Sequence, residues 1–85
     1  MNEQDSNLVQ FIEYLVKNIV TAPSDVMIEK NMNSYNETFV IHVASADMGI
    51  LIGKGGKNIN AIRSLVSIKA NPVRVYVQIA EQLPE

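Results

Sequence analysis

The fold is decided by one stretch of the sequence, which reads, from position 50 to position 63, Ile50-Leu51-Ile52-Gly53-Lys54-Gly55-Gly56-Lys57-Asn58-Ile59-Asn60-Ala61-Ile62-Arg63. Three glycines stand within four consecutive positions, 53–56. Glycine lets the backbone turn with positive φ and leaves no side chain to hold a neighbouring molecule away. Apolar residues at helical spacing continue from the glycines to Ala70, and Asn71-Pro72 ends them. The stretch therefore predicts a glycine turn between a short helix over 48–52 and a longer helix over 57–70.

The amino-terminal segment predicts one more helix. Apolar residues recur at spacings of three and four from Leu8 to Val20, which is typical of an amphipathic helix. We expect this helix to begin at a capping residue, Ser6 or Asn7, after a flexible tail over residues 1–6. Ser45 or Asp47 is expected to cap the short helix over 48–52 in the same way.

Three further segments predict strands. Runs of β-branched and apolar residues over 26–30 and 38–43 flank a turn-rich segment over 31–36, which indicates an antiparallel hairpin. Strict alternation over 73–79 predicts a last strand that buries its Val and Ile side. The predicted order is helix, strand, strand, helix, helix, strand, so the fold class is α+β.

Length and composition exclude several classes of protein. The chain has 85 residues and 9.4 kDa, which is the size of one small domain, and 47% of its residues are hydrophobic. It contains no Cys and one His, His42, so a disulfide, a Cys nucleophile and a thiolate or His-based zinc site are excluded. Neither a basic signal segment nor an apolar run of about 20 residues is present. We expect a cytoplasmic protein without metal, cofactor or membrane contact.

Two nucleotide-binding motifs fail on their spacing. A P-loop needs four residues between its first glycine and the Gly-Lys pair, but only three separate Gly49 from Gly53, and Gly55 follows Lys54. A dinucleotide loop would need glycine at the position of Asn58. The acidic residues are scattered and lie away from the glycine turn. We therefore predict a binding protein with no enzymatic activity and no small-molecule substrate.

The net charge of −2 conceals a division of charge along the chain. The 33 residues from Met48 to Ala80 contain no Asp or Glu and carry five cations, Lys54, Lys57, Arg63, Lys69 and Arg74. The other 52 residues carry two cations and all nine acids, a charge of −7. Such a separation of charges indicates a surface that binds an anion. The alternative is a chance distribution of few charges.

The glycine turn has the chemistry of a phosphate site. The long helix begins after it, and the unpaired amides and positive dipole end of a helix N-terminus favour an anion. Lys57 in that first turn opposes the helix dipole, so local propensity is overruled there. Phosphate binding explains this violation, and the alternative is a plain turn between helices with a solvated lysine.

The quoted stretch resembles the signature of the KH domain, an isoleucine followed by G-x-x-G between two helices. The order of elements is similar to the type II KH fold, in which a three-stranded sheet is covered by three helices. The resemblance implies one KH domain over residues 1–85, with Gly53, Lys54, Gly55 and Gly56 as the loop that clamps about four nucleotides. Gly55 departs from the usual polar or basic third position, so affinity is expected to depend on Lys54, Lys57 and Arg63.

A chain that is little more than one KH domain resembles the KhpA family of small bacterial RNA-binding proteins. That resemblance implies single-stranded RNA as partner, self-association, pairing with a second KH protein of the KhpB type, and a role as an RNA chaperone in post-transcriptional regulation. It also implies an apolar groove walled by Ile52, Ile59 and Ile62, with Ile41 or Val43 as its floor. For each of these residues the alternative is an ordinary place in the core.

The polar side and the second apolar side of the long helix each predict a further contact. Arg63 lies on the polar side of the helix, where it reaches RNA or is solvated. Ala61, Leu65 and Ile68 form a second apolar stripe, which is a dimer interface unless the first helix covers it. Phe11 and Phe39 are expected in the core, so base stacking and sequence preference should be modest. The competing function is a protein scaffold whose glycine loop no longer binds nucleic acid.

Overall fold

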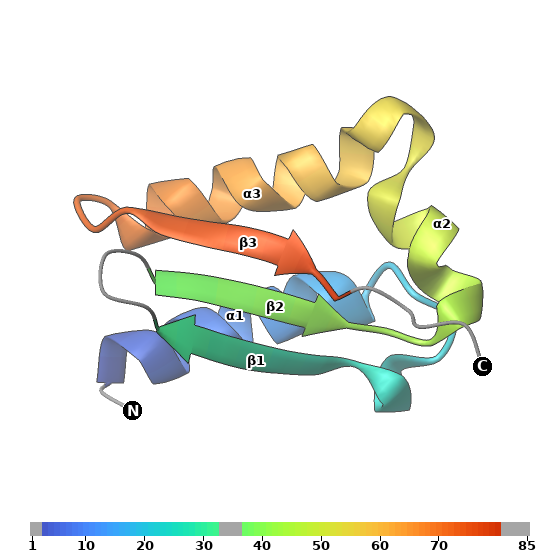
Figure 1. Cartoon of the computed structure of the whole chain (residues 1–85), viewed down its shortest axis with the longest axis horizontal. Coiled ribbons are helices and arrows are strands. Elements are labelled where there is room, and N and C mark those ends of the chain that lie inside the picture. Colours follow the sequence, from blue (N-terminus) through green and yellow to red (C-terminus); the bar gives the residue numbers. More distant parts are fainter. Residues whose placement is uncertain (1–2, 33–36, 81–85) are drawn as a thin grey trace.

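The computed structural model describes residues 3–32 and 37–80, which form an α+β fold of the predicted order. Its elements are α1 (Glu3–Lys17), β1 (Met27–Met32), β2 (Glu37–His42), α2 (Met48–Ile52), α3 (Lys57–Ala70) and β3 (Val75–Ile79). Three strands form one sheet, and α1 and α3 pack against each other and against it (Figure 1). The type II KH arrangement predicted from the sequence is confirmed. No helix of the described part of the chain is long and apolar enough to cross a membrane.

The sheet has the order β1-β2-β3, with β1 antiparallel to β2 and β2 parallel to β3. Phe39 lies opposite Lys30 on β1 and Val77 on β3, so β2 is the central strand. Two parallel strands cannot be joined by a tight hairpin and need a crossover connection. The crossover here runs through α2 and α3, and it places the glycine turn beyond one end of the sheet (Figure 1).

One face of the sheet is buried beneath α1 and α3. The side chains of Phe39 and Ile41 on β2 are inaccessible, and they meet apolar side chains from both helices. The helices contribute Leu8, Ile12 and Val16 from α1, and Ile59, Ile62, Val66 and Ala70 from α3. These residues have the spacings of three and four that predicted the helices, so the predicted helical faces are the ones that form the core.

Helix α1 begins at Glu3, earlier than predicted. Residues 3–6, which we expected in a flexible tail, are helical, and neither Ser6 nor Asn7 is the capping residue. The Asp5 side chain explains the difference, because it is buried and accepts a hydrogen bond from the Lys30 ammonium on β1. This bond raises the pKa of Lys30 above its ordinary value. The pair joins the first turn of the helix to the sheet.

Asp47 does not cap α2, contrary to the sequence-based expectation. Its carboxylate turns away from α2 and accepts hydrogen bonds from the Thr21 amide (3.1 Å), the Thr21 hydroxyl (2.7 Å) and the Ala22 amide (3.1 Å). The Asp47 residue is 1% exposed. Ser45 lies one turn earlier, in a 3-10 turn, and makes no side-chain cap. Asp47 therefore joins the start of α2 to the loop after α1.

The strand boundaries differ slightly from those predicted. β1 extends through Asn31 and Met32, for which the sequence predicts a turn, while residues 33–36 of that turn lie outside the described residues. β3 begins at Val75, and Val73, predicted as its first residue, is exposed. Asn71-Pro72 does end α3, as expected.

We predict that Asp47→Asn lowers the free energy of unfolding at pH 7. The amide keeps one acceptor oxygen but turns a donor toward the backbone amide of Ala22, which loses its partner. The hydrogen bonds from Thr21 are the main cause of a lowered pKa at Asp47, so the carboxylate stabilises the fold above the unfolded pKa of about 3.9. That contribution is lost as the pH falls through the lower, folded pKa.

Chemical denaturation of both proteins between pH 7 and pH 3 measures this effect. The difference in the free energy of unfolding between wild type and Asp47→Asn should be largest at neutral pH and should become smaller below about pH 4. A difference that does not change with pH would show that ionisation of Asp47 contributes nothing.

Candidate nucleic-acid interface

The glycine turn between α2 and α3 depends on positive φ angles. Gly53 has φ 76° and ψ 170°, a conformation open in practice to glycine alone, and Gly55 and Gly56 have φ 64° and 80°. The Gly53 amide ends α2 by donating to the Gly49 carbonyl at 2.9 Å. Residues 54–56 form a single 3-10 turn that leads directly into α3. The structure thus brings Gly53, Lys54, Gly55 and Gly56 together in one sharp turn.

Asn58 holds this turn from the inside. Its side-chain amide donates to the Ile50 carbonyl at 2.7 Å, which links the first turn of α3 to the last turn of α2. A Cβ atom on Gly53 would lie 2.7 Å from Asn58 Cγ and 2.9 Å from the Asn58 backbone nitrogen. By contrast, a Cβ atom on Gly55 would meet no atom within 4 Å. Gly53 is required by the packing inside the turn, while Gly55 faces open space.

The cations near the turn are available to a ligand. Lys54 and Lys57 are exposed, and neither has a carboxylate partner among residues 3–32 and 37–80. Lys17 and Lys30, which lie in the acidic part of the sequence, are instead paired with Glu13 and with Asp5 and Glu37. The two cations of the acidic part of the sequence are therefore paired with acids, whereas Lys54 and Lys57 have no acidic partner within the described residues.

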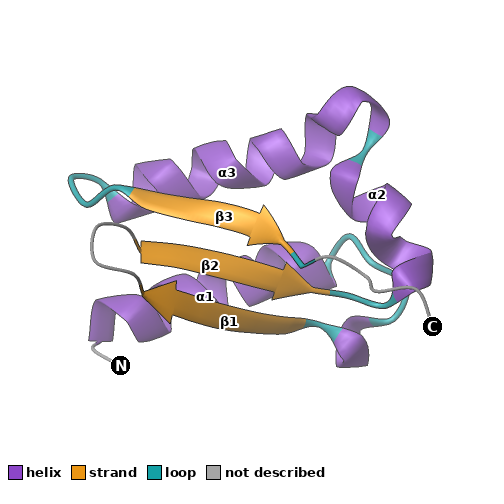
Figure 2. Ribbon diagram, viewed as in Figure 1, coloured by secondary structure: helices purple, strands orange, loops and turns teal. Residues whose placement is uncertain are grey.

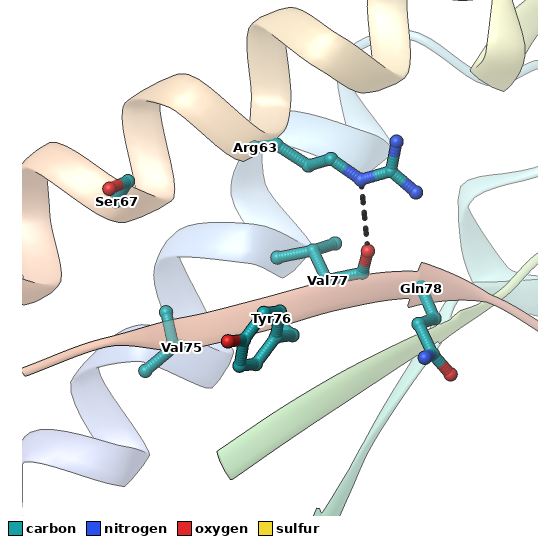
Figure 3. A pocket seen from close by; sticks show the side chains of 6 residues that line it. All are labelled: Arg63, Ser67, Val75, Tyr76, Val77 and Gln78. Atoms are coloured by element: carbon teal, nitrogen blue, oxygen red, sulfur yellow. Dashed lines mark hydrogen bonds between the residues drawn. The ribbon is translucent and has the colours of Figure 1, made fainter. Parts of the chain in front are cut away.

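Arg63 lies beside the edge of β3 and is neither free in solvent nor paired with an acid. Its Nε atom donates to the Val77 carbonyl at 3.0 Å (Figure 3). Its Nη1 atom donates to the Asn60 side chain at 3.2 Å. The carbonyl of Val77 belongs to the outer edge of the sheet, because β3 pairs only with β2 among the described strands. Arg63 thus bridges α3 and β3 with a fixed guanidinium.

A groove of about 410 Å³ lies between α3 and β3. Arg63 and Ser67 line it from α3, and Val75, Tyr76, Val77 and Gln78 line it from β3 (Figure 3). Tyr76 is 41% exposed, so the groove offers an aromatic ring, which the expectation of modest base stacking does not include. The signal was present in the alternation of β3, since burying its Val and Ile side leaves Tyr76 and Gln78 on the other side.

The predicted apolar groove of isoleucines does not form. Ile59 and Ile62 are 4% and 3% exposed and belong to the core between α3 and the sheet, as do Ile41 and Val43. Ile52 is 39% exposed and lies at the end of α2, next to Gly53. Of the three predicted walls, only Ile52 offers surface to a ligand, because the other two fill the helical face that packs on the sheet.

The second apolar stripe of α3 is exposed. Leu65 and Ile68 are 44% and 73% exposed, and Ala61 is exposed as well. Helix α1 packs against a neighbouring part of α3, where the Lys69 ammonium lies 5.3 Å from the centre of the Phe11 ring. The alternative in which α1 covers the stripe is therefore wrong.

No group of three His, Cys, Asp or Glu side chains within the described segments is arranged to hold a metal ion. The site is thus built from glycine backbone, cations, amides and one aromatic ring. This set of groups suits a polyanion with flat, polar bases.

Comparison with known proteins agrees with this geometry. The family model for the KH domain of KhpA and KhpB matches residues 9–79. The chain is similar to the RNA-binding protein KhpA of Chlamydia pneumoniae, with 39% identity over 75 residues, which covers 86% of this chain and 96% of the relative. It is 36% identical over 76 residues to the RNA-binding protein KhpA of Mycobacterium tuberculosis, covering 88% and 95%. No solved structure gave a significant match.

We predict that three glycine-to-alanine variants differ in stability as the packing requires. Gly53→Ala should lower the free energy of unfolding by about 2 to 4 kcal/mol, because it adds a clash with Asn58 to backbone strain. Gly55→Ala should cost about 1 to 2 kcal/mol from its positive φ alone. Gly49→Ala, in the open first turn of α2, should be neutral or stabilising by up to about 1 kcal/mol.

Urea denaturation of the three variants measures these differences. Equal losses at Gly53 and Gly55 would contradict the role of Asn58 inside the turn. The Gly49 variant is the matched control for adding a methyl group to this corner of the fold.

Proposed function

The chain belongs to the KhpA/KhpB family of KH domains, and we propose that it binds single-stranded RNA by holding the nucleic-acid backbone at the glycine turn. That family is not enzymatic, which confirms the expectation of a binding protein. The relatives that cover most of the chain are RNA-binding proteins by name. We further propose that the protein acts in the cytoplasm, in post-transcriptional regulation.

One observation carries the proposal: the turn of positive-φ glycines lies beside two exposed lysines that have no acidic partner in the described part of the chain. Gly55 has open space around it, so a phosphate or ribose can approach the backbone closely. Helix α3 begins at Lys57, and its N-terminal amides and dipole add to the attraction of a phosphate. The bound strand would then follow α3 toward Arg63, about 9 Å further along the helix axis.

The affinity of this single site should be low and should depend on salt. Lys54, Lys57 and Arg63 supply only a few contacts to phosphate, and each such contact releases counterions that salt competes for. Tyr76 adds one ring for stacking, which is sequence-tolerant. Useful affinity therefore calls for a second RNA-binding module joined to the first.

We propose that the exposed stripe of Ala61, Leu65 and Ile68 provides this second module by pairing two domains. Large apolar side chains at 44% and 73% exposure on one helix face are typical of a protein contact. The partner is a second copy of the chain or a KH protein of the KhpB type. In either case two glycine turns would bind one RNA together.

We predict that a Lys54→Asp, Gly55→Asp double variant loses binding to a short single-stranded RNA while remaining folded. The two substitutions place negative charge where the phosphate would lie, and both positions are exposed. Fluorescence anisotropy at two salt concentrations, with circular dichroism as a check of folding, measures this. Wild type should bind, and its binding should weaken as the salt concentration rises.

A Lys17→Asp, Asn18→Asp double variant is the matched control, because it changes the net charge by the same amount at two exposed positions of α1 and its following turn. Its affinity should stay within about twofold to threefold of wild type at moderate salt, where distant charges are screened. Equal losses in both double variants would indicate a general charge effect. Absence of binding by wild type would favour the scaffold function.

We predict that Ile68→Glu converts a dimer into a monomer. A charge at the most exposed apolar position of the stripe cannot be buried against a second subunit without a partner. Sedimentation equilibrium should give the mass of two chains for wild type and of one chain for the variant. Gln10→Glu, an exposed position on α1, is the control and should leave the mass unchanged. A dimeric Ile68→Glu protein would contradict the proposed interface, and a monomeric wild type would exclude a second copy of the chain as the partner.

A further inference from the structure

The face of the sheet that points away from α1 and α3 carries a set of polar side chains that the glycine turn does not use. Because side chains alternate along a strand, this open sheet face consists of the residues between those that point toward α1 and α3. On β3 these are Tyr76 and Gln78, and on β2 and β1 the residues opposite them are Thr38, Val40, Asn31 and Glu29. No described helix lies over this face, since α1 packs behind the sheet (Figure 2).

A hollow of about 610 Å³ lies on the open sheet face. Val40, 8% exposed, is part of its lining, and Asn31, Arg63 and Gln78 supply polar groups around it. The hollow is an open depression of the surface and not an enclosed cavity. Arg63 and Gln78 also line the groove between α3 and β3, so the hollow continues that groove around the edge of β3.

The polar groups of the hollow are available for hydrogen bonding. Within residues 3–32 and 37–80, the side-chain amides of Asn31 and Gln78 form no hydrogen bond, and neither does Nη2 of Arg63. A side-chain amide offers one donor group and one acceptor in a plane, which matches the N6 and N7 atoms of adenine. A mostly polar lining with planar donors and acceptors around Val40 suits the polar edge of a base.

The charges near the hollow indicate which part of a nucleotide would lie there. Glu29 on β1, which lies opposite Val40, is beyond the hollow on the open sheet face, with 3.3 Å between its Oε1 atom and His42 Nε2. The part of this face beyond Arg63 is therefore unfavourable for a phosphate. Lys54 and Lys57, which favour phosphate, lie on the α3 side of β3. A strand held at the glycine turn would thus keep its backbone along α3 and direct a base across the edge of β3.

We propose that the hollow on the open sheet face binds an adenine base of the RNA strand held at the glycine turn, and that Gln78 sets the preference for that base. This inference rests on the proposed function. It adds a base-reading subsite, and it assigns different tasks to the two sides of β3. The α3 side binds the backbone without regard to sequence, and the sheet side distinguishes bases.

The test is the change in base preference caused by Gln78→Glu. Glutamate has nearly the same shape as glutamine but lacks the donor that adenine N7 needs, and its carboxylate accepts a hydrogen bond from cytosine N4. The ratio of affinities for eight-nucleotide oligoadenylate and oligocytidylate should therefore shift toward cytidylate by about tenfold. The added negative charge weakens the binding of both RNAs by the same factor. The ratio of the two affinities therefore isolates the effect on the base. Gln78 is exposed, so the variant should fold.

Gln10→Glu is the matched control, since it makes the same substitution at an exposed position on α1, and its ratio should equal that of wild type. A ratio for Gln78→Glu within twofold of wild type, while RNA binding still depends on Lys54 and Gly55, would overturn the subsite and leave the proposed function standing. Absence of RNA binding by wild type would overturn both.

Discussion

The parallel pairing of β2 with β3 is the constraint on which the rest of the structure depends. Parallel neighbours require a crossover, and the crossover in this chain must turn sharply between a helix of five residues and one of 14. Gly53 makes that turn possible, because its conformation and the space beside Asn58 exclude any side chain. The hydrogen bond from Asn58 to Ile50 then fixes the angle between the helices. The same turn exposes the backbone of Gly55, so the fold and the proposed binding site have one origin.

Buried polar anchors connect this turn to the rest of the domain. Asp47 joins the start of α2 to the loop after α1 through three hydrogen bonds, and Asp5 joins α1 to Lys30 on β1. Both acids are buried and engaged in these hydrogen bonds, so they do not compete for Lys54 and Lys57. These two buried acids therefore support the scaffold, and Lys54 and Lys57, which have no acidic partner within the described residues, are left for a ligand.

The sequence was sufficient to predict the helices, the strands and the glycine turn, because each has a local signal. Helical spacing located α3 from Lys57 to Ala70, as observed, and strict alternation located β3. The tertiary role of a polar side chain has no such signal. Asp47 stands where a cap is expected, but it binds a loop 25 residues away, and Asp5 extends α1 through a contact with the sheet. Ile59 and Ile62 lie in the core and not at a groove, because spacing along a helix does not say which apolar side chains pack on the sheet. The exposed side of β3, with Tyr76 and Gln78, could have been predicted from the alternation of that strand.

The central claim, that RNA is held at the glycine turn, is tested most directly by titrating the ¹⁵N-labelled protein with a short single-stranded RNA and following the backbone amide resonances. The account predicts that the largest shifts occur at Lys54, Gly55, Gly56 and Lys57, with smaller shifts along the edge of β3. Binding that shifts resonances on the stripe of Leu65 and Ile68 or on α1, and leaves those of the turn unchanged, would contradict it.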